Sequence, residues 1–272
     1  MNKLEKRMID NLKELAQIAG VSLIKAEFEA EATRLDEAIR LKEIVDSANM
    51  GLILKIGGAE AIRDMFDAQL LDVSGLVAPM IESSYALRKY LDAIETFFPS
   101  ELKSSISFGI NLETINTYDN IEQIFLTKGI KRLKTITVGR VDLACSMGLG
   151  RDDINSKSVY NITEEILKKA KKMGFETTIG GGIAIEALPF IKKLAAKKLL
   201  DKYETRKVVF PVRKTFYKSQ QGILLANEFE LLWLENKKNY YAAIYREDDK
   251  RISMLKKRLK LGKKVSGKTK QR

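Results

Sequence analysis

The chain has 272 residues, 45% of them hydrophobic, and a formal net charge of +12, and its size suits one large α/β barrel or two small globular domains. It contains no histidine and one cysteine, which excludes Ser-His triads, His-ligated zinc sites and an internal disulfide framework. No apolar run reaches the roughly 18 residues of a membrane span, and the N-terminus lacks the apolar region of a signal peptide, so we expect a cytoplasmic protein that does not enter a membrane.

Strands and helices are predicted in alternation after an amphipathic N-terminal helix. Short β-branched and apolar runs predict strands at residues 21–29, 51–58, 75–81, 106–113, 135–142, 175–182 and 207–210. Helical patterns lie between them, at about 34–47, from 59, from 83, from 161, and at 187–197.

This alternation indicates a parallel sheet with right-handed crossovers. We therefore predict an α/β fold, a TIM-like (β/α)8 barrel with an N-terminal helix and extra C-terminal helices. The eighth strand is not evident from the sequence, and a doubly wound open sheet is the alternative.

The C-terminal part differs from the rest of the chain. Two helices are predicted at about 219–236 and 239–260, and the run Leu231–Leu234 predicts a buried face that packs on the barrel or on a second subunit. Residues 250–272 hold 11 of the 48 lysines and arginines and no acidic residue, so the remainder is almost neutral. Nucleic acid is therefore expected to bind, if at all, only at this tail.

We expect three parts in the chain. Residues 1–215 form the barrel with its N-terminal helix, 216–260 a helical extension, and 261–272 a basic, disordered tail.

Two acidic residues end successive predicted strands, Glu113 and Asp142. The carboxyl ends of parallel barrel strands converge on one face, where the active site lies. Two hard oxygen ligands suit Mg²⁺ or Mn²⁺, and a chain without histidine must use oxygen ligands or its single cysteine. The alternative is a pair of solvated loop acids.

Other polar residues near strand ends are Glu29, Lys55, Glu82, Arg140 and Arg206. Glycines follow two of the strands, at Gly57–Gly58 and at Gly180–Gly182, each before a helix. Such glycines let backbone N–H groups approach an anion at a helix N-terminus, although they also make plain tight turns.

Four segments carry a family resemblance. Residues 77–86 read Val-Ala-Pro-Met-Ile-Glu-Ser-Ser-Tyr-Ala, residues 110–115 read Ile-Asn-Leu-Glu-Thr-Ile, and residues 139–148 read Gly-Arg-Val-Asp-Leu-Ala-Cys-Ser-Met-Gly. Residues 21–57 add a strand–helix–strand layout. Over about residues 21–194 the chain resembles the HpcH/HpaI aldolase and citrate lyase β-subunit family, within the phosphoenolpyruvate/pyruvate barrel superfamily.

The resemblance implies that Glu113 and Asp142 bind a divalent metal, which holds a pyruvate-like or acyl enolate while a C–C bond is made or broken. The family usually has a substrate-binding arginine where this chain has Lys55, and its aldolase branch has a histidine where this chain has the acidic stretch 27–31. These departures indicate a divergent subgroup.

We therefore expect a carbon–carbon lyase or aldolase that depends on Mg²⁺ or Mn²⁺ and acts on a carboxylated keto compound or an acyl thioester. The candidate catalytic residues are Lys55, Glu29 and Glu82. The candidate substrate-binding residues are Lys55, Gly57, Gly58, Arg140 and Arg206.

The alternatives are metal-assisted phosphoryl or phosphosugar chemistry on the same barrel, or a non-catalytic binding protein with a polyanion-binding tail. The leucine- and tryptophan-rich C-terminal helix predicts a homo-oligomer.

Overall fold

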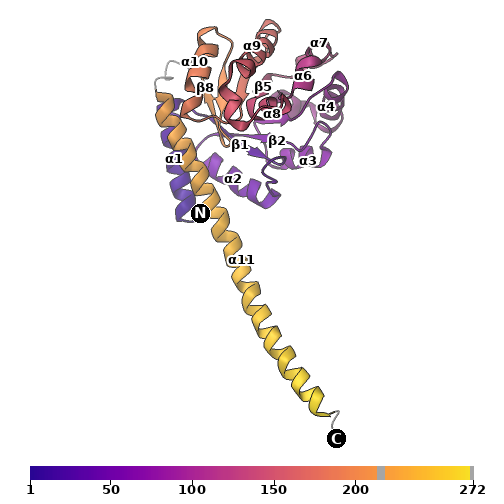
Figure 1. Cartoon of the computed structure of the whole chain (residues 1–272), viewed down its shortest axis with the longest axis vertical. Helices are drawn as coiled ribbons and strands as arrows, with labels where there is room; N and C mark the ends of the chain where they lie inside the picture. The colour runs from indigo at the N-terminus through magenta and orange to yellow at the C-terminus, as the bar shows by residue number, and fades with distance from the viewer. Residues whose placement is uncertain (213–217, 270–272) are drawn as a thin grey trace.

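Eight strands close into a barrel in the order of the chain (Figure 1). The structure is a computed structural model that describes residues 1–212 and 218–269, the last nine as backbone only. The strands are β1 (Leu23–Glu27), β2 (Gly51–Lys55), β3 (Gly75–Ala78), β4 (Ser107–Leu112), β5 (Thr135–Gly139), β6 (Glu176–Gly180), β7 (Lys202–Glu204) and β8 (Val208–Pro211). The predicted α/β barrel is confirmed, and the open sheet is excluded.

Helices surround the barrel and follow most of its strands (Figure 1). They are α1 (Lys3–Ala19), α2 (Leu35–Ser47), α3 (Ile62–Leu70), α4 (Ser84–Phe97), α5 (Ser100–Ser105), α6 (Ile115–Asp119), α7 (Ile121–Phe125), α8 (Arg140–Ser146), α9 (Lys157–Lys172), α10 (Leu188–Ala196) and α11 (Ser219–Thr269). Short 3₁₀ helices lie at Ile130–Arg132, Arg151–Asn155 and Ile185–Ala187. Within the described ranges, no helix has both the length and the apolar character needed to cross a membrane.

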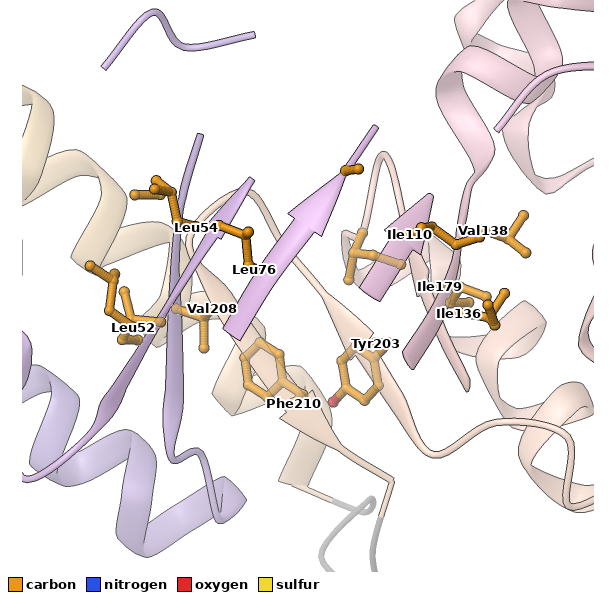
Figure 2. Close-up of a cluster of buried hydrophobic side chains, with 14 of the residues drawn as sticks. Leu52, Leu54, Leu76, Ile110, Ile136, Val138, Ile179, Tyr203, Val208 and Phe210 are labelled. Atoms are coloured by element: carbon orange, nitrogen blue, oxygen red, sulfur yellow. The ribbon is translucent and has the colours of Figure 1, made fainter. Parts of the chain in front are cut away.

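The strands alternate between apolar and polar side chains. Figure 2 shows apolar strand residues such as Leu54, Ile110 and Val138, which belong to the buried core. Successive side chains of a strand point to opposite faces. The neighbours of these apolar residues, including Lys55 and Asn111, therefore point the other way, and both are buried.

The last two strands differ from the prediction. β7 pairs in parallel with β6, whereas β8 pairs antiparallel with both β7 and β1. The strand predicted at 207–210 is therefore β8, and it runs against the other seven. β7 was not predicted because it has three residues, two of them charged. The β7–β8 turn, closed by the Thr205 N–H donating to the Val208 carbonyl at 3.0 Å, lies at the end where the parallel strands finish.

One continuous helix of 51 residues, α11, replaces the two predicted helices. Its first half packs along α1, with Leu232 and Trp233 buried, and its second half extends away from the barrel (Figure 1). Residues 261–269 continue the helix. The predicted boundary at 215/216 and residues 270–272 lie outside the described residues, so the division into three parts stays a prediction.

The Glu5 carboxylate joins α1, α2 and α11. It accepts hydrogen bonds from Arg40 Nε at 2.6 Å, from Asn236 Nδ2 at 3.3 Å and from the Asn2 N–H at 2.6 Å. The hydrogen bonds from Arg40, helped by those from Asn2 and Asn236, outweigh the effect of burial and lower the pKa of Glu5 to about 2. The charged form of Glu5 therefore stabilises the contacts of α1 with α2 and α11.

Glu5→Gln is expected to reduce the free energy of unfolding at neutral pH by about 2 kcal/mol. Because the folded-state pKa lies below the ordinary value of 4.5, this contribution is present above that value and is lost as the pH falls toward 2. Urea unfolding at a series of pH values should show that the free energy of unfolding of Glu5→Gln falls less steeply at acid pH than that of wild type. Glu14→Gln, at an exposed position of the same helix, serves as control. The same acid dependence of the free energy of unfolding in Glu5→Gln as in wild type would contradict the prediction.

Candidate active site

A cavity of about 490 Å³ lies at the C-terminal ends of the barrel strands. Its walls come from the ends of β1, β2, β4, β5, β6 and β7, from the residue after β4, and from α8 and α11. The charged side chains that line it are Lys25, Glu27, Glu29, Lys55, Glu113, Asp142, Arg151, Glu204, Arg206 and Glu230. This is the end at which barrels of this kind place their active sites.

Lys55, at the end of β2, is held between two carboxylates. Its Nζ lies 2.7 Å from Glu29 Oε2 and 3.7 Å from Glu113 Oε1. Burial alone would lower the pKa of Lys55, but the charges of Glu113, Glu29 and Glu27 outweigh it and raise that pKa. Lys55 is therefore a fixed positive charge at the floor of the cavity.

Neighbouring residues hold the side chain of Glu113 in place, and only 1% of the surface of this residue is exposed. Its Oε1 accepts a hydrogen bond from the Met80 N–H at 3.1 Å, and its Oε2 accepts one from Asn111 Nδ2 at 3.0 Å. A Cβ atom on Gly139 would lie 2.2 Å from Glu113 Oε2. The carboxylate can therefore occupy this position only because residue 139, at the end of β5, is glycine.

Gly139→Ala is expected to displace the Glu113 carboxylate, because a real Cβ atom cannot approach an oxygen so closely. We expect a loss of stability of about 2 kcal/mol and an activity at least about 100-fold lower. Thermal unfolding and steady-state kinetics measure the two effects. The matched control is Gly58→Ala, where a Cβ atom would meet nothing within 4 Å. Equal behaviour of the two variants would contradict this account of Glu113.

Asp142, in the first turn of α8, lines the same cavity as Glu113. Burial raises the pKa of Glu113 despite the opposing charge of Lys55, and the charge of Asp142 raises it further. Mg²⁺ is usually held by one or two carboxylates together with water and substrate oxygens, and the pair fits this requirement. In the described part of the chain, no group of three or more Asp, Glu, Cys or His side chains is arranged around a metal position. An ion here would therefore keep open coordination positions.

A second group of charges lies beside the first. Lys25 Nζ is 2.9 Å from Glu27 Oε1 and 2.6 Å from Glu204 Oε1. Burial would lower the pKa of Lys25, but the charges of Glu204 and Glu27 outweigh it and raise that pKa. Gly180 leaves room for Glu204, since a Cβ atom there would lie 3.1 Å from Glu204 Oε1.

The β7–β8 turn and α11 complete the wall. Arg206 lines the cavity and lies 4.0 Å from Glu230 of α11. Behind it, the buried Lys207 ammonium pairs with Glu31 at 2.5 Å and lies 5.8 Å from the centre of the Trp233 ring. Burial lowers the pKa of Lys207 and raises that of Glu230.

Arg140 does not line the cavity, contrary to its predicted role in substrate binding. Its fully buried guanidinium donates to the carbonyl oxygens of Gly180, Gly181 and Gly182 at 3.3, 2.7 and 3.2 Å, and to Asn155 Oδ1 at 2.7 Å. Arg140 therefore fixes the glycine turn that lines the cavity, and we assign it a positioning role.

Three other predicted residues also lie outside the cavity lining. Glu82 Oε1 accepts a hydrogen bond from Thr114 Oγ1 at 2.6 Å, and Thr114 is the residue that caps the start of α6. The Gly57 N–H donates to Asp64 Oδ2 at 2.7 Å, so it is already satisfied. Gly58 has open space around it. We therefore do not retain Glu82, Gly57 or Gly58 as site residues.

Sequence reasoning did not select several residues that line the cavity: Lys25, Asn111, Arg151, Asn227 and Glu230. For Lys25 a signal was present, because Lys25 and Glu27 alternate with the apolar Ile24 and Ala26 along a strand and so share a face. Asn227 and Glu230 carried no such signal, since α11 reaches the cavity only through the tertiary structure.

The fold and the site define a closed barrel with a charged cavity at the carboxyl ends of its parallel strands. No family model matches the sequence, and a comparison with curated proteins finds no match. Solved structures do match.

One is the HpcH/HpaI aldolase from Desulfitobacterium hafniense DCB-2, with a TM-score of 0.58, 14% identity, and coverage of 72% of this chain and 81% of that one. Another is the citrate synthase SbnG, with a TM-score of 0.59, 14% identity, and coverage of 82% and 89%. A third, a HpcH/HpaI aldolase/citrate lyase family protein from Burkholderia cenocepacia J2315, has a TM-score of 0.59, 15% identity, and coverage of 90% and 100%.

The chain therefore has the barrel fold of HpcH/HpaI aldolase and citrate lyase family proteins, and the predicted resemblance is confirmed at the level of fold. The sequence identity of 13–15% agrees with a divergent form of this fold.

Proposed function

We propose that the protein is a lyase that makes or breaks a carbon–carbon bond next to a carboxylate or an acyl thioester. The observation that carries the proposal is that Glu113, Asp142 and Lys55 line one cavity at the active-site end of the barrel. The solved structures that share this fold include an aldolase and a citrate synthase, which supports the same class of chemistry.

Glu113 and Asp142 would hold Mg²⁺ or Mn²⁺. When bound there, the ion would supply positive charge beside the substrate oxygen on which negative charge develops. Asn111, Gly139 and the Met80 N–H keep the Glu113 carboxylate in place for this role.

Lys55 is the residue that we assign to the substrate carboxylate. Lys55 is 7% exposed, lines the cavity and stays charged beside Glu29 and Glu113. A lysine provides charge and up to three donors, but not the planar fork of an arginine, so the substrate need not present a bidentate carboxylate. We assign Arg206 and Arg151, which line the same cavity, to a second anionic group of the substrate.

Glu29 is the carboxylate that we assign to proton transfer. It lines the cavity and contacts Lys55, whereas the other candidate, Glu82, is bound to Thr114 outside it. In the cleavage direction, Glu29 would take the proton from the substrate hydroxyl group. The electron pair of the broken C–C bond would pass to the carboxylated fragment, whose carbon then accepts a proton.

Deuterium exchange tests the proposal directly. The protein is incubated with pyruvate, and in parallel with acetyl-CoA, in D₂O with and without Mg²⁺, and loss of the methyl proton signal is followed by NMR. We expect Mg²⁺-dependent exchange of at least one of the two compounds, at least about 10-fold above the protein-free rate. No exchange, together with no Mg²⁺ binding in titration calorimetry, would refute the proposal.

Phosphoryl or phosphosugar chemistry is the second candidate, because the turn Gly180–Gly182 lines the cavity beside Arg151 and Arg206. Gly181 and Gly182 have φ angles of +76° and +62°, and a Cβ atom on either would lie within 3 Å of a neighbouring atom. A crystal soaked with phosphate and oxalate separates the two candidates. Oxalate between Glu113 and Lys55 supports the lyase, whereas phosphate at the turn with no oxalate bound supports phosphoryl chemistry.

A non-catalytic protein with a polyanion-binding tail is the third reading of the sequence. It predicts salt-sensitive polyanion binding that disappears when residues 250–272 are deleted. The lyase proposal predicts that this deletion leaves pyruvate exchange unchanged, because none of the described residues after Glu230 lines the cavity.

A further inference from the structure

Helix α11 carries a stripe of exposed apolar side chains on the face away from the barrel. Of the nine large hydrophobic residues exposed on its described part, seven fall at positions a and d of one heptad frame. These seven are Leu224, Leu231, Leu234, Tyr245, Ile252, Leu255 and Leu259. Apolar residues at a and d are the sequence pattern of a helix that pairs with another helix.

The second half of the helix has no partner in the monomer. Between Ala242 and Lys260 no side chain is buried, and this segment stands clear of the barrel (Figure 1). Helices in water draw most of their stability from packing of an apolar face. In this segment the apolar face, whose packing would stabilise the helix, is exposed to solvent.

The stripe is too narrow for a membrane surface. Along the projecting segment, Ile252, Leu255 and Leu259 alternate with charged side chains such as Arg251, Lys256 and others on both flanks. Helices that lie on membranes have a broad apolar face, whereas an a/d stripe is the narrow seam of a coiled coil.

The charges of the segment select the direction of pairing. An acidic block, Glu247–Asp249, precedes a basic block, Lys256–Lys260. In a parallel pair, like blocks would lie side by side, and Asp248, at a d position, would face the Asp248 of the other copy. In an antiparallel pair centred between Ser253 and Met254, the acidic block of each helix lies opposite the basic block of the other. In the antiparallel pair Asp248 faces Leu259 instead, so the two like charges are kept apart.

We propose that residues 247–260 of α11 pair with the same segment of a second copy of this chain as an antiparallel coiled coil. In this register Ile252 packs against Leu255 of the other copy, and Asp249 faces Lys256. Arg251 also comes opposite Arg258, and Asp248, one turn before Arg251 on the same helix, offsets that repulsion. The proposal is independent of the proposed activity.

The geometry leaves room for both barrels. With a rise of 1.5 Å per residue, the last contact between α11 and the barrel, Tyr241 with Glu37, lies about 19 Å from the centre of the pair. The barrels therefore lie at opposite ends of the paired segment, and no surface of the barrel has to be buried.

The test is the molecular mass of the full-length protein by analytical ultracentrifugation at up to about 100 µM. We expect twice the chain mass of 30.8 kDa. The double variant Ile252→Asp/Leu255→Asp should raise the dissociation constant at least about 100-fold. Ser253→Asp, between them but off the stripe, should change it less than about 3-fold. Neither change touches a buried residue, and thermal unfolding checks that the barrel stays folded.

Charge exchange tests the direction. Asp249→Lys and Lys256→Asp should each weaken the dimer by about 10-fold, because each removes two symmetric ion pairs, and the double variant should restore wild-type affinity to within about 3-fold. A monomeric wild type would overturn the proposal, and so would an Ile252→Asp/Leu255→Asp variant whose mass is unchanged. If that variant then also lost binding to anionic lipid vesicles, the stripe would be a membrane surface instead. Failure of the charge exchange to restore the dimer would overturn the antiparallel register.

Discussion

Asp142→Asn is expected to lower kcat/KM for the carbon–carbon reaction at least about 1,000-fold and the affinity for Mg²⁺ about 100-fold. The substitution keeps the size of the side chain but removes one of the two negative charges that would hold the ion. Glu113 cannot compensate, because burial raises its pKa and its oxygens already accept bonds from Met80 and Asn111. Titration calorimetry and the pyruvate exchange assay measure the two effects.

The matched control is Asp152→Asn, an exposed acid on a neighbouring 3₁₀ helix that does not line the cavity. It should leave both quantities within about 2-fold of wild type. If Asp142→Asn bound Mg²⁺ as tightly as Asp152→Asn, the assignment of Asp142 as a metal ligand would be wrong. Thermal stability in saturating Mg²⁺ gives a third readout, since an ion that binds only the folded protein raises the melting temperature of wild type and not of Asp142→Asn.

Lys55→Met is expected to destabilise the fold by about 3–5 kcal/mol and to abolish activity. The substitution leaves Glu113, 1% exposed, and Glu29 without their common cation. Protonation of Glu113 relieves this uncompensated charge, and a carboxyl group with a raised folded-state pKa loses stability as the pH rises through that pKa. The loss should therefore be larger at pH 8 than at pH 5, as urea unfolding at the two pH values would show.

Two companion variants interpret the result. Lys89→Met removes a lysine that is also paired, 2.6 Å from Glu60, but 37% exposed, and it should change the free energy of unfolding far less than Lys55→Met does. Lys55→Arg keeps the charge and should recover most of the lost stability. A similar loss in Lys55→Met and Lys89→Met would mean that the pairing around Lys55 contributes no more than a surface ion pair.

The sequence allowed the centre of the candidate site to be predicted, because local patterns determine it. Glu113, Asp142, Lys55 and Glu29 each follow or end an apolar strand, and barrel topology brings strand ends together whatever the rest of the chain does. The same rule gave Arg140 a role that the structure does not support. Position at a strand end fixes where the Cα atom lies but not where a long side chain points, and Arg140 turns to the carbonyl oxygens of Gly180–Gly182.

What the sequence did not predict depends on contacts between distant segments. Strand propensity carries no direction, so the pattern at 207–210 gave no sign that β8 runs against its neighbours. Glu230 reaches the cavity because α11 packs back across the barrel, beside the turn that holds Arg206 and Lys207. The unbroken length of α11 was also hidden, because its polar residues near 237–239 resemble a break between two helices.

The reversal of β8 has a consequence for how the protein folds. β8 inserts between β7 and β1, so the ring of strands is complete only when residues 208 and 209 meet residues 23 and 24. Contacts so far apart in sequence form slowly, because the loop entropy must be overcome first. Until then β1 and β7 present two open edges that can pair with other chains. A nascent or truncated chain that ends before Val208 should therefore aggregate, and barrel closure should be the slow step of refolding.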